Sequence, residues 1–317
     1  MLFYDLQRAF SFVMNDQCIE IQQILGHITK STNLLTMCYS SILCFDLAVY
    51  GIFPMLFTVV KFTLTGSYDV PLRTPTEAKY CIPHFDTNIW IWMPLNAVLN
   101  MLLELHGLAV VFVECFTWSL VYAICCMFRI LHILSNKLSD KTLAKEQWAV
   151  QFKHMKTLHD TVLRSARTLE EIMCGQLLWL YLSTIFALCL GMVVLSLAIE
   201  EVYLLFMTFT VFGYCIFQTF SFSYLGTELI EQSSAVSDAI FHSAWYTQDV
   251  KRQKDLCFVL LRANKPVRLT AAKFFVVTRD SFTQLVCNEN DEHIASGDGV
   301  GSDRDVRAAR PVIHFCP

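Results

Sequence analysis

The stretch QTFSFSYLGTELIEQSSAVSDAIFHSAWYTQDVKRQKDLCFVLLRANKPVRLTAAKFFVVTRDSFTQL, residues 218–285, is where the chain changes from membrane to cytosolic character. Its sequence predicts an apolar helix that ends near residues 224–226, then a charged amphipathic stretch, then a new apolar helix after Pro266. Upstream of this stretch the chain is predominantly apolar. Downstream of Leu285 it becomes polar, acidic and glycine-containing.

Composition places the chain among polytopic membrane proteins. Of its 317 residues 55% are hydrophobic and only 16% are charged, which leaves too little polar surface for a soluble domain of this length. The net charge of -4 comes without a basic cluster, so no nucleic-acid partner is expected. Because no Cys pair or Cys/His cluster has zinc-ligand spacing, the sequence predicts no metal site and no cofactor.

The predicted fold is all-α: a membrane helical bundle with long cytosolic helical extensions. Four segments are long enough to span a bilayer, at about 37–64, 92–128, 172–199 and 203–226, and a partial fifth span is predicted at 270–286. Residues 1–36 are predicted to form a cytosolic helical lead-in, and 37–284 the transmembrane domain. Pro54 should kink the first span. The tail at 285–317 is too polar to continue a membrane helix and is predicted to be disordered.

The charges of the connecting segments predict the orientation. Segments 129–170 and 228–269 hold eight and six Lys/Arg, whereas 65–91 holds two and the turn at 200–202 none. Since positively charged loops stay inside, the two long segments, which form a cytosolic anchor, and the amino terminus are predicted to be cytosolic.

Three carboxylates and one histidine fall within the four complete predicted spans, where charge is costly and is therefore a functional candidate: Asp46, Glu104, Glu114 and His106. On a helical wheel Glu114 lies about 80° from each of the two others in its span. The three should face protein or water. A metal or proton site is the enzymatic alternative, but no nucleophile or HExxH pattern accompanies it.

Residues 218–285 carry the signature of a family. The signature includes Tyr224 with Gly226, Ser233-Ser234, Ala239, Trp245-Tyr246, the basic run 251–254, and Lys265-Pro266 followed by 267–271 (VRLTA). With the Ile82–Asp86 element IPHFD, this set resembles insect odorant receptors. The resemblance implies a seven-span receptor of inverted topology in the plasma membrane of olfactory sensory neurons.

Two departures from this family pattern concern the ends of the chain. The family has seven spans, and the four complete and one partial span here align with the third to the seventh. After Gln284 the apolar helix of the family gives way to the acidic tail. The expectation is a chain incomplete at both ends, whose tail is intron read-through or a truncating splice form, and which in this form does not conduct.

The resemblance implies a mechanism and partners. Members of the family are ligand-gated, non-selective cation channels that assemble as tetramers with a shared coreceptor, and their last helix lines the pore. Carried over by motif, the anchor and assembly candidates are Tyr224, Gly226, Trp245, Tyr246, Lys265 and Pro266. For the Trp-Tyr pair, packing within the subunit and a role at a subunit interface both stay open.

A small volatile, apolar odorant requires a mostly apolar cavity among helices, with lipid around the bundle. The extracellular halves of the spans offer aromatic and thioether side chains with a little hydrogen-bonding capacity. The candidate ligand-binding residues are Phe53, Phe57, Trp92, Met93, Asn96, Tyr203 and Met207. Two other classes remain as alternatives: a gustatory receptor of the same superfamily, whose diagnostic region is missing here, and an unrelated transporter, for which no internal repeat is found.

Overall fold

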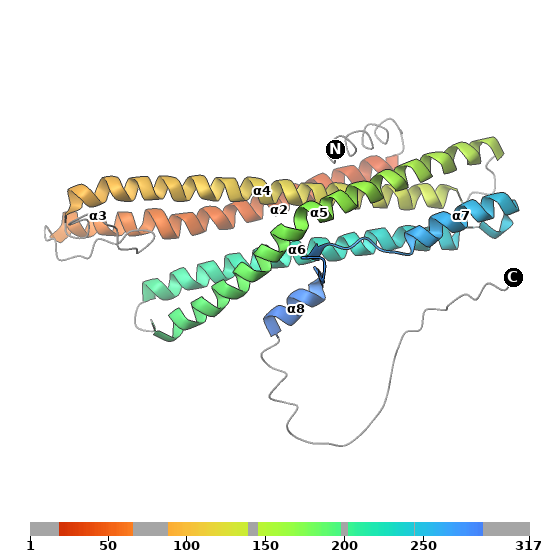
Figure 1. Ribbon diagram of the computed structural model, residues 1–317. Helices are drawn as coiled ribbons and strands as arrows, with labels where there is room; N and C mark the ends of the chain where they lie inside the picture. The colour runs from red at the N-terminus through yellow and green to blue at the C-terminus, as the bar shows by residue number, and fades with distance from the viewer. Residues whose placement is uncertain (1–18, 66–87, 139–144, 198–201, 244, 288–317) are drawn as a thin grey trace, which may run out of the picture. The chain divides into compact units, whose positions relative to one another are not determined.

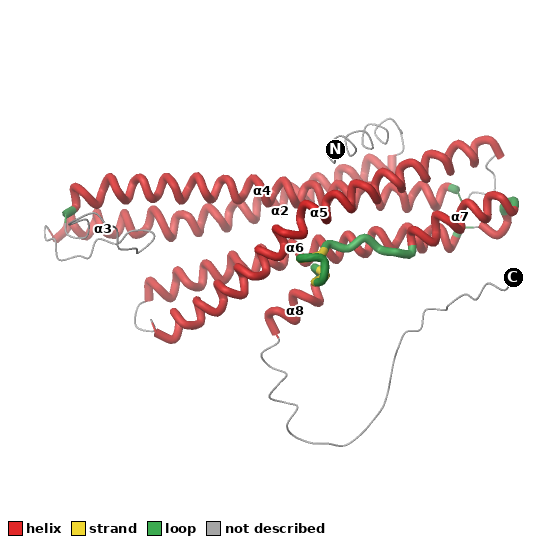
Figure 2. Tube along the Cα trace, in the orientation of Figure 1, coloured by secondary structure: helices red, strands yellow, loops and turns green. Residues whose placement is uncertain are grey.

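The computed structural model describes residues 19–65, 88–138, 145–197, 202–243 and 245–287 (Figure 1), and helix dominates them (Figure 2). The helices are α2 (Ile19–Leu47), the π-helix η1 (Ala48–Ile52), α3 (Phe53–Thr65), α4 (Ile89–Lys137), α5 (Lys145–Leu197), α6 (Val202–His242), the 3-10 helix η2 (Trp245–Thr247), α7 (Val250–Ala263) and α8 (Arg279–Cys287). Strands β1 (Thr270–Ala271) and β2 (Phe275–Val276) pair antiparallel before α8.

The chain divides into two units, Met1–Phe282 and Thr283–Pro317, and the helix packing lies within the first. A number of predictions concern residues that the structure does not describe. These are residues 1–18 of the lead-in, the element at 82–86, the turn at 200–201 and the tail from 288 onward.

Four helical segments of the described part are long and apolar enough to cross a membrane: Thr32–Ile52, Ile89–Lys137, Glu146–Leu197 and Leu205–His242. Their outer faces carry exposed large apolar side chains such as Leu108 and Phe112, which are 66% and 73% exposed and suited to lipid. The prediction of an all-α, multi-pass membrane bundle is confirmed.

The long helices extend well beyond a bilayer. α4 has 49 residues and α5 has 53. At 1.5 Å per residue such helices are about 75 to 80 Å long, against about 30 Å of hydrocarbon, and tilt alone cannot absorb the excess. Residues 145–170 of the predicted segment 129–170 and the span predicted at 172–199 are one continuous helix up to Leu197. The prediction of a helix that ends near 224–226 is wrong, because α6 runs on to His242.

The helices pack around α4, which contacts α2, α5 and α6, while α5 also runs beside α6 (Figure 1). Hydroxyl pairs join α5 to α6 within the apolar segments: Tyr181 Oη with Ser223 Oγ at 2.7 Å, and Thr184 Oγ1 with Thr219 Oγ1 at 2.9 Å. Without water, each hydroxyl needs such a partner, and these pairs fix the register of the two helices.

The apolar side chains that recur at helical spacing along 129–170 form a packing face. Its members that are buried are Ile130, Leu138, Trp148, Phe152, Met155, Leu158 and Leu163. Trp148 stacks on Phe152 with ring centroids 5.0 Å apart. The parts of α4 and α5 between the two apolar spans thus have a hydrophobic core of their own.

The first membrane helix changes its winding just before Pro54. The π-helix η1 occupies residues 48–52 between α2 and α3. A proline lacks the N–H for the usual helical bond and crowds the carbonyl four residues earlier, and a wider turn relieves both problems. The distortion that the sequence assigns to Pro54 therefore takes the form of a π-helix in the preceding turn.

The prediction of a helix from Thr270 is wrong. Thr270 pairs with Val276 and Ala271 with Phe275, and the turn between them has Ala272 at φ 52° and Lys273 at φ 66°. α8 begins only at Arg279, where the Thr278 hydroxyl accepts a hydrogen bond from the Ser281 N–H.

Tertiary contacts with α5 explain the hairpin. Thr270 Oγ1 donates to Glu170 at 2.7 Å, and the Ala272 N–H donates to the Cys174 carbonyl at 3.3 Å. The Phe275 ring meets Tyr181 edge-on at 5.1 Å. These contacts override the helix propensity of the Ala-Ala-Lys run.

Candidate functional site

Three of the predicted ligand-binding residues face the interior of the bundle. Trp92 and Asn96 on α4 are 0% and 1% exposed, and Met207 on α6 is 9% exposed. Phe53 and Met93 lie on the outside, 57% and 40% exposed. The side chains of Phe57 and Tyr203 fall outside the described part of the structure.

Polar groups accompany the buried three. Asn100 Nδ2 donates to Asn96 Oδ1 at 3.3 Å, and Tyr50 Oη donates to the Met207 carbonyl at 3.1 Å. Gly51 allows η1 and α4 to approach each other here, because a Cβ on residue 51 would lie 2.4 Å from Asn100 Oδ1. Within the described residues Asn96 Nδ2 and Asn100 Oδ1 are buried and have no partner. One donor and one acceptor are thus available inside an apolar bundle.

Further along the bundle a polar network joins α2, α4 and α6. Glu114 is 5% exposed, and one of its carboxylate oxygens accepts a hydrogen bond from Gln218 Nε2. The hydroxyls of Tyr39 and Tyr214 lie 2.9 Å apart, and the Tyr39 ring meets Trp118 edge-on at 4.8 Å. Glu114 therefore faces protein, in a setting where a polar contact between helices cannot be replaced by water.

The other predicted intramembrane groups lie elsewhere. Glu104 and His106 are exposed, on the two flanks of the buried face of α4, and are not brought together with Glu114. Asp46 is half-buried on α2 beside Thr210 of α6. Over the described residues no three His, Cys, Asp or Glu side chains gather as a metal site would require.

The Tyr224–Gly226 motif lies within α6, where the segment that follows the β1–β2 hairpin packs against this helix. A Cβ on Gly226 would lie 2.2 Å from the carbonyl oxygen of Val277, so only glycine lets this segment rest on the helix. The Arg279 guanidinium lies over the Tyr224 ring, 5.7 Å from its centroid. The motif is therefore a contact site for the segment that leads into α8.

The remaining anchor residues are divided between inside and outside. Trp245 is half-buried, with its Nε1 donating to the Phe241 carbonyl at 3.2 Å, whereas Tyr246 is 67% exposed. α7 ends at Ala263, and Pro266 follows shortly after it because a proline cannot continue a helix. Lys265 is exposed. The next residue, Val267, donates its N–H to Ser233 Oγ at 3.0 Å and thereby ties this connection to α6.

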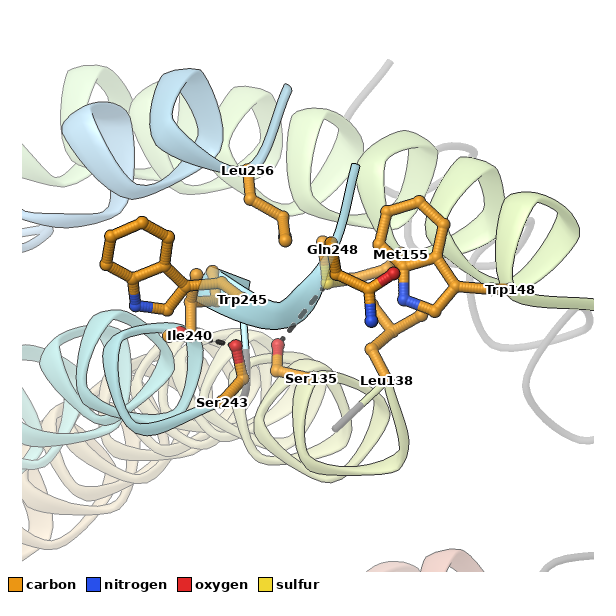
Figure 3. Close-up of a pocket in the computed structure, with 9 residues that line it drawn as sticks. All are labelled: Ser135, Leu138, Trp148, Met155, Ile240, Ser243, Trp245, Gln248 and Leu256. Atoms are coloured by element: carbon orange, nitrogen blue, oxygen red, sulfur yellow. Dashed lines mark hydrogen bonds between the residues drawn. The ribbon is translucent and has the colours of Figure 1, made fainter. Parts of the chain in front are cut away.

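A small cavity lies among α4, α5, α6, η2 and α7 (Figure 3). Its volume is about 10 Å³, room for about one water molecule, which excludes an odorant. In Figure 3 the two tryptophans lie at opposite ends, with the two serines between them. The lining residues are Ser135, Leu138, Trp148, Met155, Ile240, Ser243, Trp245, Gln248 and Leu256.

Sequence reasoning missed several residues that complete these contacts: Tyr39, Tyr214 and Gln218 around Glu114, and Thr227, Glu231 and Arg279 beside the Tyr-x-Gly motif. A signal was present for the second group, because residues 224, 227 and 231 follow helical spacing on one face. Nothing in the sequence pairs Glu114 with a residue 104 positions away.

Comparison with known proteins identifies relatives of the chain. A family model described as 7tm Odorant receptor matches residues 2–288. Putative odorant receptor 92a of Drosophila melanogaster is 24% identical over 140 residues, which are 42% of this chain and 34% of that protein. Odorant receptor Or2 of Anopheles gambiae is 22% identical over 177 residues, 52% of this chain and 47% of that protein.

A coreceptor also matches. The odorant receptor coreceptor of Drosophila melanogaster is 32% identical over 74 residues, 23% of this chain and 15% of that protein. The chain thus spans less than half the length of each of these three relatives.

A solved structure shares the fold. The olfactory receptor OR5 of Machilis hrabei, determined in complex with eugenol, matches with a TM-score of 0.73 at 15% identity. The match covers 89% of this chain and 71% of the receptor. The family is one of receptors rather than enzymes, and the match over residues 2–288 shows that this multi-pass membrane chain belongs to the odorant receptor family.

Proposed function

We propose that the chain is the odorant-binding, tuning subunit of a ligand-gated, non-selective cation channel that it forms with an odorant receptor coreceptor. It acts in the plasma membrane of olfactory sensory neurons, with its amino terminus in the cytosol. The observation that carries the proposal is the family match over nearly the whole chain. The bundle of membrane-length helices supports it, as does the shared fold with a receptor solved in complex with eugenol.

The ligand is proposed to bind where η1, α4 and α6 approach one another, near Trp92, Asn96 and Met207. These side chains are buried and offer an aromatic face, an amide and a polarisable thioether. The unpartnered Asn96 Nδ2 and Asn100 Oδ1 supply one donor and one acceptor. A small apolar molecule with a single polar group suits such a site, because a few placed polar groups fix orientation while apolar contact supplies affinity.

Assembly with a coreceptor is supported by the outer face of α7. The helix buries Leu256, Val259 and Ala263 on one side, yet on the other it exposes large apolar side chains. Val250, Phe258 and Leu261 are 67%, 73% and 61% exposed, and Tyr246 before the helix adds to this face. An exposed apolar surface on a cytosolic element is typical of a protein interface. We propose that a coreceptor subunit covers it in a tetramer.

The function is tested by expressing the chain, extended at both ends to the seven spans of the family, in cells with and without the coreceptor and recording currents evoked by a panel of volatile odorants that includes eugenol. We expect inward cation currents from the extended chain, with an odorant profile that the coreceptor alone does not give. Indistinguishable profiles with and without this chain, when it is present at the cell surface, would contradict the proposal.

A further inference from the structure

The segment between β2 and α8 rests directly on α6. Val277 is completely buried, its N–H donates to the Leu269 carbonyl at 2.9 Å, and its own carbonyl occupies the space above Gly226. This is a contact between two backbones, which only a glycine on α6 permits.

Arg279, the first residue of α8, is held by three further contacts with α6. Its backbone N–H donates to Thr227 Oγ1 at 2.9 Å. Its guanidinium pairs with Glu231 at 2.6 Å and lies over the Tyr224 ring. Both ends of this arginine, backbone and guanidinium, are therefore fixed to α6.

The groups that hold Arg279 form one face of α6. Residues 220, 224, 227 and 231 recur at three- and four-residue intervals, the spacing of neighbours along a helix. At the near end of this face the Phe220 ring meets Phe282 of α8 edge-on, with centroids 5.4 Å apart. Together with Gly226, this face thus contacts the chain from Val277 through Phe282, the last turn before α8 and the first turn within it.

The start of α8 is formed at the same place. Thr278 accepts a hydrogen bond from the Ser281 N–H at 3.2 Å, and Ser281 Oγ donates to the Val276 carbonyl at 2.7 Å. The residue that caps the helix lies between the residue seated on Gly226 and the residue held by Glu231. A shift of α6 along its axis would consequently displace the point at which α8 begins.

We propose that Tyr224, Gly226, Thr227 and Glu231 form a clasp for Arg279, and that this clasp makes Arg279 the positioning residue for the final helix. It transmits movement of α6, which carries part of the proposed odorant site, to α8. The transmission of movement from α6 to α8 rests on the proposed function, in which α8 is the beginning of the pore-lining helix. The clasp itself does not rest on the proposed function.

The clasp is tested by charge reversal and amide hydrogen exchange on the full chain in detergent. Arg279→Glu and Glu231→Arg should each speed exchange of the amides at 279–282 by about two- to fivefold, the range for an exposed ion pair. The double variant should restore protection, because it recreates the pair with opposite polarity. Exchange rates unchanged in both single variants, or a double variant no better than either, would overturn the clasp.

A control pair and a third substitution make the result of the exchange experiment interpretable. Reversing Asp160 and Arg164, an exposed ion pair within α5 at 2.7 Å, should leave exchange at 279–282 unchanged. Thr227→Val keeps the shape of its side chain but removes the acceptor, so it should accelerate exchange of the Arg279 amide even if a charge-reversed chain fails to fold. An unchanged Arg279 amide in Thr227→Val would also count against the clasp.

Currents recorded with the coreceptor separate the clasp from the proposed function. The single reversals should change the maximal odorant current more than the odorant concentration for half-maximal response, with recovery in the double variant. Protection that follows charge complementarity without any odorant current would sink the proposed function and leave the clasp. Odorant currents that ignore both reversals would leave the function and overturn the coupling.

Discussion

At the residue scale, Gly226 matters because it has no side chain. A Cβ there would meet the Val277 carbonyl oxygen at 2.2 Å, and that atom belongs to a backbone held on its other side by Leu269. Neither partner is a flexible side chain that could turn aside. The family motif Tyr-x-Gly is thus explained by a close approach of two chain segments.

Gly226→Ala should destabilise the receptor by about 1–3 kcal/mol, the usual cost of forcing atoms into a packed contact. Gly213→Ala on the same helix is the matched control, since nothing lies within 4 Å of the position its Cβ would take. That control should be neutral or slightly stabilising, because Ala is the better helix former. Thermal unfolding of the purified chain in detergent measures both, and equal unfolding temperatures would refute the close approach.

Buried polar residues show how far sequence reasoning reaches at this scale. The apolar surroundings of Glu114 single it out, because a carboxylate in a membrane span needs a polar neighbour. Its partner Gln218 comes from a helix far along the chain, and the spacing within either helix carries no information about that contact. The same limit applies to Asn96 and Asn100, which look like ordinary polar residues until the bundle buries them.

At the element scale, α7 has an apolar face that packs inside the chain and a second apolar face that is exposed. Phe258 is the most exposed large apolar side chain of this face, at 73%. A single helix of 14 residues outside the apolar spans has no internal reason to expose such residues to water, and an interface supplies one.

Phe258→Glu should weaken co-purification of the chain with its coreceptor by about tenfold, the size expected for an aromatic residue central to an interface. Its effect on thermal stability of the isolated chain should be small, because the side chain is exposed. Val150→Glu, also an exposed apolar position but on α5, serves as the control. Unaltered co-purification in Phe258→Glu would show that this face is not where the coreceptor binds.

The connection from α7 to α8 marks the limit of prediction for elements. Long apolar periodicity identifies the membrane helices, and the break predicted at Pro266 is confirmed, but a β1–β2 hairpin follows it in place of the predicted helix. The hairpin at 270–276 was not predictable, because Ala-Ala-Lys favours helix locally and only contacts with Glu170, Cys174 and Tyr181 of α5 make the strands the better solution.

At the scale of the whole molecule, composition and hydropathy suffice to predict an all-α membrane bundle, since few arrangements satisfy backbone hydrogen bonds in lipid. The same reasoning cannot say which side chains face inward. Trp92 and Met93 are neighbours of similar chemistry, yet one is buried and the other exposed, because only the packing of α4 on its neighbours decides between them.

The central claim, that odorants bind inside this bundle beside Asn96, is tested most directly by the Asn96→Leu variant in odorant dose–response recordings with the coreceptor. Loss of one buried hydrogen-bond donor should raise the odorant concentration for half-maximal response by about two- to tenfold for ligands with a polar group. Asn136→Leu, the same exchange at an exposed position near the other end of α4, should leave it unchanged. Equal responses of the two variants across the panel would contradict the claim.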